Sequence, residues 1–217
     1  QPRAIDKFIL DKKEHNYYSQ TMLAGMFFNL RGTPFIYQGE EIGMENFERK
    51  DISEFDDIGS HGQYQRALEE GFTKEEAMHF LNLRSRDNTR TPMQWDNSKY
   101  AGFSDHEPWL KMTGSQDKIN VENQFNDPNS IYSFYKKMIS IRKQEDILVY
   151  GDFEEIKTVD DVIGYKRTYQ GQEIICLCNF TNTEQPIPDI QGNILLDNYN
   201  NYNPTTLKPY QFIMIKK

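Results

Sequence analysis

The character of the sequence changes near Leu148. Before this residue, apolar side chains recur at helical spacing; after it, short runs rich in β-branched and aromatic residues alternate with turn residues such as Gln170-Gly171. Those runs occupy residues 162–169, 173–181, 193–196 and 212–215. The change predicts an α/β segment over residues 1–147, followed by a small antiparallel β-sandwich over residues 148–217.

Four stretches of the first segment have helical signals. They are residues 14–30, which end before Gly32, residues 61–70, residues 73–83, which Thr73 and Glu76 open as a capping box, and a stretch that Asp127-Pro128 opens as N-cap and first-turn proline. The last stretch has the clearest apolar stripe: Ile131, Phe134, Tyr135, Met138 and Ile141.

A short apolar run follows the first predicted helix. Phe35-Ile36-Tyr37 lies between Pro34 and Gly39 and is too brief for a helix, so we predict a buried strand. The next stretch, from Glu40 to Asp57, is acidic and has no clear period. We expect a long loop here, and long loops after strands tend to carry function.

A second polar stretch places an arginine, an amide, an indole and a carboxylate close together. It reads Asn88-Thr89-Arg90-Thr91-Pro92-Met93-Gln94-Trp95-Asp96. A pyranose offers paired hydroxyls and a flat C–H face, which match the planar donors of Arg and an aromatic ring. The pattern therefore indicates sugar binding, and the alternative is a proline-anchored surface turn with a half-buried Trp.

Charge and cysteine usage narrow the class of protein. With 25 basic and 33 acidic residues the net charge is −8, which disfavours nucleic acid and anionic membranes as partners. Cys176 and Cys178 would lie ~6.7 Å apart on one face of a strand, at the upper limit for a disulfide, so we interpret them as reduced core residues. Without a long apolar run, the sequence predicts a soluble, cytoplasmic protein.

Three segments together resemble a known family. They are Gln1-Pro2-Arg3, the stretch GTPFIYQGEEIGM over residues 32–44, and RDNTRTPMQWD over residues 86–96, with Ala101-Gly102-Phe103 after it. In order and spacing they are similar to the C-terminal third of the α-glucosidases of glycoside hydrolase family 13, on the branch of oligo-1,6-glucosidases, dextran glucosidases and trehalose-6-phosphate hydrolases. The resemblance covers essentially the whole chain.

The resemblance implies the C-terminal part of a (β/α)8 TIM barrel followed by the β-sandwich called domain C. Residues 14–30 would be the seventh barrel helix, 34–38 the eighth strand and 130–145 the eighth helix. The loop from Glu40 to about Asn126 would lie at the C-terminal face of the barrel, where such enzymes keep their sites.

The family's nucleophile, general acid and third carboxylate would all precede Gln1, so no catalytic residue is expected in this chain. Retaining hydrolysis needs two carboxyl groups about 5 Å apart. Adjacent acids such as Glu40-Glu41 and Asp56-Asp57 make poor pairs because neighbouring side chains in an extended segment point apart. We expect these acids to serve loop structure and helix N-termini, and the chain to be inert alone.

The resemblance does imply substrate contacts. Arg90 would hold the non-reducing terminal glucosyl unit by donating to its 4-hydroxyl, and Arg3 would orient the wall of the pocket. The alternative for Arg90 is an ion pair that closes the loop on Asp87 or Asp96. We expect Gln94 and Trp95 to anchor the loop rather than to touch sugar.

The implied parent is a retaining α-glucosidase that takes α-glucoside oligosaccharides and needs no cofactor or metal. Its other partner would be the N-terminal part of the same barrel. Asp57-Ile58-Gly59 departs from the branch, whose members usually carry Glu after Asp-Ile, so α-1,6, α-1,4, sucrose and trehalose-6-phosphate substrates stay open. The alternatives are a sucrose isomerase or trehalose-6-phosphate hydrolase parent, and a non-catalytic carbohydrate-binding derivative.

Overall fold

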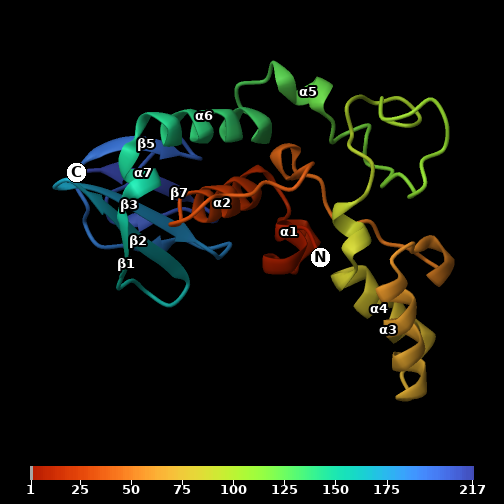
Figure 1. Ribbon diagram of the computed structural model, residues 1–217. Coiled ribbons are helices and arrows are strands. Elements are labelled where there is room, and N and C mark those ends of the chain that lie inside the picture. The colour runs from red at the N-terminus through yellow and green to blue at the C-terminus, as the bar shows by residue number, and fades with distance from the viewer. Residues whose placement is uncertain (1) are drawn as a thin grey trace. The chain divides into compact units, whose positions relative to one another are not determined.

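The protein packs as two compact units in the computed structural model, which describes residues 2–217 (Figure 1). One unit consists of residues 2–10 and 36–127, and the other of residues 11–35 and 128–217. Gln1 of the Gln-Pro-Arg motif lies outside the described residues. These units group residues by their contacts and combine segments distant in the sequence, whereas the predicted boundary at residue 148 divides the chain at a single point. That boundary stays a prediction.

The unit that contains the C-terminus is built on an antiparallel sheet. Its strands follow the order β1-β2-β3-β7-β5, and a separate pair is formed by β4 and β6. The elements of this unit are η1 (Lys12–Glu14), α2 (Tyr17–Phe28), α6 (Ile131–Gln144), α7 (Asp146–Tyr150), β1 (Asp152–Ile156), β2 (Val162–Tyr169), β3 (Gln172–Asn179), β4 (Gln185–Pro186), β5 (Asn193–Asp197), β6 (Thr206–Leu207) and β7 (Phe212–Lys216).

The turn predicted at Gln170-Gly171 joins β2 to β3. Tyr169 pairs with Gln172 across it, and both turn residues have positive φ angles, 49° for Gln170 and 77° for Gly171. Two consecutive positive φ values define the tight turn whose twist matches that of the flanking strands. The turn therefore fixes the register of the longest strand pair in the sheet.

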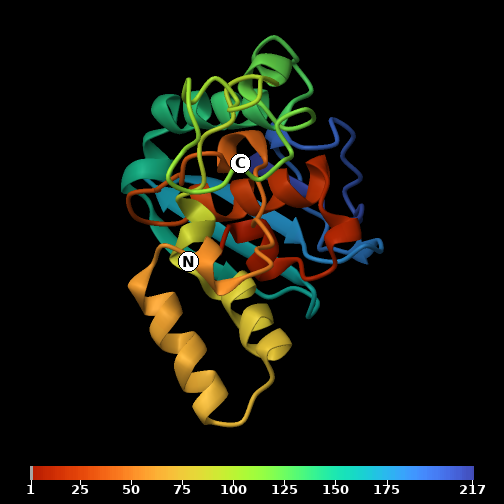
Figure 2. The ribbon, with the colours of Figure 1, turned by 90° about the vertical axis from the view of Figure 1, so that its right-hand side faces the viewer.

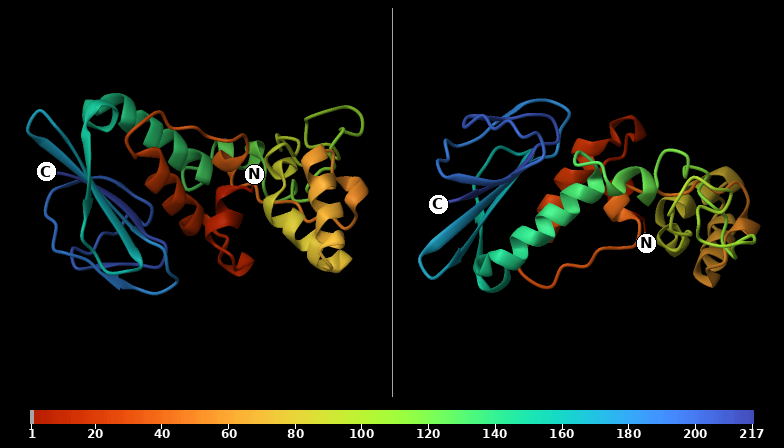
Figure 3. Two further views of the ribbon diagram at one scale, coloured as in Figure 1. Left: turned by 60° about the horizontal axis from the view of Figure 1, so that its bottom comes forward. Right: turned by 90° about the horizontal axis from the view of Figure 1, so that it is seen from above.

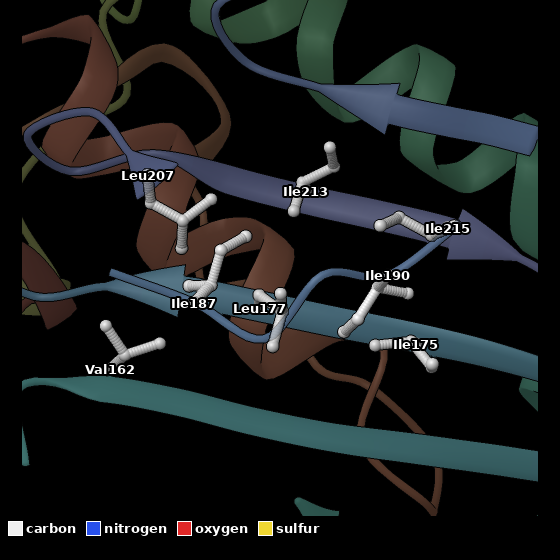
Figure 4. Packing of buried hydrophobic residues seen from close by; sticks show 8 residues of the cluster. All are labelled: Val162, Ile175, Leu177, Ile187, Ile190, Leu207, Ile213 and Ile215. Atoms are coloured by element: carbon white, nitrogen blue, oxygen red, sulfur yellow. The ribbon is translucent and has the colours of Figure 1, made fainter. Parts of the chain in front are cut away.

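Both faces of β3 and β7 are buried. On one face, a cluster of aliphatic side chains from the sheet packs against residues of the β4–β6 region (Figure 4). The cluster consists of Val162, Ile175, Leu177, Ile187, Ile190, Leu207, Ile213 and Ile215. On the other face lies α2, beside α6 (Figure 3). Cys176 and Cys178 are buried and free, which confirms their interpretation as core thiols.

The C-terminal end of α2 is capped by side chains. Helix ends leave carbonyl groups without intrahelical donors, and here the Asn29 amide donates to Gly25 O at 2.7 Å, while Tyr165 Oη donates to Met26 O at 2.9 Å. Two buried arginines complete the cap: Arg142 donates to Phe28 O and Arg167 to Asn29 O. Cations also suit the negative end of the helix dipole.

The other unit is mostly helix and loop. Its elements are α1 (Ala4–Phe8), η2 (Glu40–Ile42), η3 (Ile52–Glu54), α3 (Ile58–Glu69), α4 (Lys74–Arg84), η4 (Arg86–Thr89) and α5 (Val121–Phe125). α3 and α4 form a helical hairpin (Figure 2), and the capping box predicted at Thr73 and Glu76 is present. Phe55, Tyr64, Ala77 and Leu81 form the core between the helices and the preceding loop.

Residues 34–38 do not form the strand that we predicted. They form neither a helix nor a strand and make no β-ladder with any segment among residues 2–217, and Phe35 is 88% exposed. A strand exists through its ladder hydrogen bonds, which need a neighbouring strand. The run is apolar, but the prediction that it forms a buried strand was wrong.

The start of α6 is also corrected. Ser130, rather than Asp127, is the N-cap, and its hydroxyl accepts from Ser133 N at 3.1 Å. Pro128 therefore lies before the helix instead of in its first turn. A sequence with two capping residues three positions apart can start at either one, and this helix begins where its apolar stripe begins.

Glycine substitutions in two helices should have opposite effects on stability. A Cβ at Gly25 would lie 2.4 Å from the Phe212 ring, so Gly25→Ala should lower the free energy of unfolding by about 1–3 kcal/mol. Gly62 in α3 has no atom within 4 Å of the added carbon, so Gly62→Ala should raise it by about 0.5–1 kcal/mol. Urea unfolding followed by circular dichroism measures both, and a stabilising Gly25→Ala would contradict the packing of α2 on β7.

Candidate functional site

The Arg90 loop begins in a short helical turn that buries most of its side chains. η4 follows α4 directly, and the Ser85 hydroxyl caps it by accepting from Asp87 N at 3.2 Å. Asp87, Asn88, Thr89 and Thr91 are buried, whereas the Arg90 side chain is 44% exposed. Arg90 therefore reaches solvent at the end of a turn in which three of the four residues, Asp87, Asn88 and Thr89, are buried.

Two carboxylates hold the Arg90 guanidinium. Its Nη1 lies 3.6 Å from Asp87 Oδ1 and 3.9 Å from Asp57 Oδ1. The Asp87 ion pair is one of the two alternatives that the sequence left open for Arg90. The other is not found, because Asp96 instead accepts from Ser98, and these hydrogen bonds hold the pKa of Asp96 below its usual value. Neither contact of Arg90 is short enough to be a hydrogen bond.

Asp87 also organises the loop before α3. Its Oδ2 accepts from Asp56 N at 2.8 Å and from Asp57 N at 3.1 Å. Asp57 in turn is the N-cap of α3, where its carboxylate accepts from Ser60 N. The Asp56-Asp57 pair thus serves loop structure and a helix N-terminus, as predicted.

A buried arginine that sequence reasoning missed fixes the same loop. Arg49 is 1% exposed, and its guanidinium lies between the rings of Phe47 and Phe55, at 5.4 and 4.9 Å from their centroids. It donates to Asn88 Oδ1 at 3.0 Å and to Asp87 O at 3.3 Å. Burial lowers its pKa, and the nearby carboxylates oppose this effect. Phe47 and Phe55, close to Arg49 in the sequence, were the signal that could have indicated its burial.

Arg3 lies beneath the loop. It is fully buried, and its guanidinium donates to Gln38 O at 2.7 Å and to Thr91 Oγ1 at 3.2 Å. Burial lowers its pKa, an effect that Glu40, Glu41 and Asp6 oppose. Arg3 therefore joins Gln38, the last residue of the segment 34–38, to Thr91, the residue next to Arg90. From this position Arg3 could orient the wall of a site, and that role stays a prediction.

Gln94 anchors the loop as expected. Its amide donates to Ile119 O, and its carbonyl oxygen accepts from Thr113 Oγ1 at 2.6 Å. Trp95 is held by its backbone, because its N donates to Ala101 O at 2.8 Å, while half of its side chain is exposed.

The glutamates after residues 34–38 also have structural partners. Glu40 accepts from Ala4 N at 3.3 Å, and Glu41 from Gly39 N at 2.7 Å. Burial raises the pKa of Glu40. Among residues 2–217, no group of three His, Cys, Asp or Glu residues is arranged to hold a metal ion, and no helix is long and apolar enough to cross a membrane.

Replacing Arg49 should loosen the loop. Arg49→Met keeps the length of the side chain but leaves the Asn88 and Asp87 acceptors without their donor, so the free energy of unfolding should fall by about 2–4 kcal/mol. Cleavage within residues 45–57 by a protease should accelerate. Arg66→Met, on the exposed face of α3, is the matched control and should change stability by less than about 0.5 kcal/mol. Equal effects of the two changes would contradict the anchoring role of Arg49.

The comparisons with known proteins agree with this arrangement. The family model described as α-amylase, catalytic domain, matches residues 1–151. An oligo-1,6-glucosidase of Halalkalibacterium halodurans is 39% identical over 97% of this chain, and a trehalose-6-phosphate hydrolase of Escherichia coli is 34% identical over 98%. The chain spans only 40% of the length of each of these two relatives.

Solved structures extend the similarity to the backbone. The trehalulose synthase of Pseudomonas mesoacidophila superposes with a TM-score of 0.92 at 36% identity, over 99% of this chain and 41% of its own. The trehalose-6-phosphate hydrolase of Bacillus licheniformis gives a TM-score of 0.90 at 34% identity, over 100% of this chain and 41% of its own. These neighbours are TIM-barrel enzymes, and the described residues form part of that barrel and the antiparallel β-domain. The chain therefore belongs to the α-amylase family, glycoside hydrolase family 13.

Proposed function

We propose that this chain is the C-terminal part of a retaining α-glucosidase that hydrolyses terminal α-glucosidic bonds of short oligosaccharides. The observation that carries the proposal is the half-exposed Arg90 guanidinium, held from one side by the carboxylates of Asp87 and Asp57 in a family member. A cation fixed in this way can donate to a sugar hydroxyl and so supply orientation without proton transfer. Arg3 contributes by holding Thr91, next to Arg90.

The catalytic carboxylates belong, in this proposal, to the part of the barrel that precedes residue 1. Residues 1–147 complete that barrel and the wall of its pocket, and residues 148–217 form domain C. The parent acts in the cytoplasm, which the two free, buried thiols support. Without the rest of the barrel the chain is inert.

A sucrose isomerase parent is the second candidate. It is favoured by the TM-score of 0.92 with the trehalulose synthase, one of whose variants has a structure in complex with the substrate sucrose. Hydrolysis of trehalose-6-phosphate is a third possibility within the same class. A carbohydrate-binding derivative without activity stands outside it.

The deciding experiment uses the product of the complete reading frame that contains residues 1–217. It is incubated with isomaltose, maltose, sucrose and trehalose-6-phosphate, and the products are followed by NMR. Release of glucose as the α-anomer supports the proposal; an isomer of sucrose supports the second candidate. If calorimetry detects heat of α-glucoside binding and no turnover occurs, the protein is the carbohydrate-binding derivative. If the protein neither binds nor converts any of these α-glucosides, all of these proposals are wrong.

Loss of the Arg90 donor should weaken the enzyme strongly. Arg90→Ala removes hydrogen bonds from a charged donor, each worth about 1.5–3 kcal/mol, so kcat/KM on the preferred α-glucoside should fall about 10- to 100-fold. Arg31→Ala serves as the control, because Arg31 is exposed and, within residues 2–217, forms a single ion pair, with Asp152 at 3.3 Å. Its kcat/KM should stay unchanged. An Arg90→Ala variant with full activity would exclude Arg90 from the site.

A further inference from the structure

We propose that Asp87 is the residue that positions Arg90 for a substrate hydroxyl, which rests on the function proposed above. The starting observation is an imbalance in the hydrogen bonds of its carboxylate. Asp87 is fully buried, and Oδ2 accepts two backbone N–H groups, yet Oδ1 is buried without a hydrogen-bond partner among residues 2–217. A buried carboxylate oxygen is costly to leave without compensation.

The Arg90 guanidinium supplies that compensation. Its Nη1 lies 3.6 Å from the free Oδ1, closer than to the other carboxylate, that of Asp57. Asp87 and Arg90 are three positions apart, so the turn of η4 itself brings their side chains together. The Asp87 oxygen without a hydrogen bond thus faces the partly exposed guanidinium of Arg90.

Asp87 is itself held by three hydrogen bonds from other segments of the chain. Its carboxylate is held by the amides of Asp56 and Asp57, and its backbone carbonyl by Arg49 Nη2. Arg49 in turn is enclosed by the rings of Phe47 and Phe55. These contacts fix the position of the negative charge beside Arg90.

The geometry leaves Arg90 free for a ligand. A guanidinium has five N–H donors, and the contacts at 3.6 and 3.9 Å are ion pairs rather than hydrogen bonds. A fixed charge that orients the group without occupying its donors is what a substrate-positioning arginine requires. An unsupported Arg side chain would lose rotamer freedom each time a sugar bound.

The test is a double-substitution cycle in the product of the complete reading frame. Asp87→Asn preserves shape and still offers an oxygen to the two amides, but removes the charge opposite Arg90. We expect KM for the preferred α-glucoside to rise roughly tenfold with kcat little changed, because an interaction made equally in ground and transition states is lost. In the Arg90→Met background, Asp87→Asn should cause no further loss.

Two results would overturn the proposal. One is an equal fall of kcat/KM on Asp87→Asn with and without Arg90; the other is a lower kcat at unchanged KM, which indicates a smaller folded fraction. Asp197→Asn is the matched control, because Asp197 is also buried and accepts backbone N–H groups from Tyr199 and Asn201. It should alter stability and leave KM unchanged.

Unfolding measurements cover the remaining cases. One such case is that Asp87→Asn does not fold; the other is that the unchanged protein has no α-glucosidase activity, so that the proposed function fails. In either case the urea midpoints of unfolding of Arg90→Met and Arg86→Met are compared. Arg86 is an exposed neighbour in the same turn. The proposal requires a lower midpoint for Arg90→Met alone, because Asp87 Oδ1 then loses its cation; equal midpoints would refute it.

Discussion

Buried arginines that donate to backbone carbonyls hold the irregular parts of this protein in place. Arg3 and Arg49 do so in one compact unit, and Arg142 and Arg167 in the other. Carbonyls in loops and at helix ends have no ladder or helical partner, and burial makes an unsatisfied carbonyl expensive. The planar guanidinium offers several donors at once, so a single side chain can satisfy carbonyls from distant segments.

Arg167 illustrates the principle. Its guanidinium donates to the carbonyls of Asn29, Leu148, Gly151 and Asp152 and to no carboxylate in the described part of the chain. Burial lowers its pKa, and so does the neighbouring Arg142. Such a residue joins the end of α2 to the helix and strand before the β2–β3 hairpin, and a smaller cation could not reach all four acceptors.

The same principle explains how the loop can keep the Arg90 guanidinium partly exposed. Arg3 and Arg49 have structural roles. Arg3 donates to Thr91, which follows Arg90 in the chain, and Arg49 donates to Asp87, which precedes it. The Arg90 guanidinium, in contrast, forms ion pairs with Asp87 and Asp57 but no hydrogen bond within the described residues, and its side chain is 44% exposed. A rigid loop of this kind can orient a ligand at little entropic cost when the ligand binds.

Local signals predicted the elements whose ends are set by local chemistry. The capping box at Thr73 and Glu76 placed α4, and Gln170-Gly171 placed the β2–β3 turn, because each depends on residues next to one another in the chain. Strand β1 was missed because Phe153 and the acidic residues around it are exposed at an edge, so no apolar alternation marks it. Residues 34–38 had the composition of a strand and lacked the neighbour that would make one.

By itself, the sequence determined the family, through the motifs around Arg3, Gly39 and Arg90. It also determined the elements that local signals mark, such as α4 and the β2–β3 hairpin. It also made Arg90 a candidate for sugar binding, which stays a prediction. Only the tertiary structure decided which of the two possible carboxylates pairs with Arg90, and that Arg49 and Arg3 are buried anchors. Partner choice among charged groups depends on distances between segments remote in the chain, and no local pattern encodes those distances.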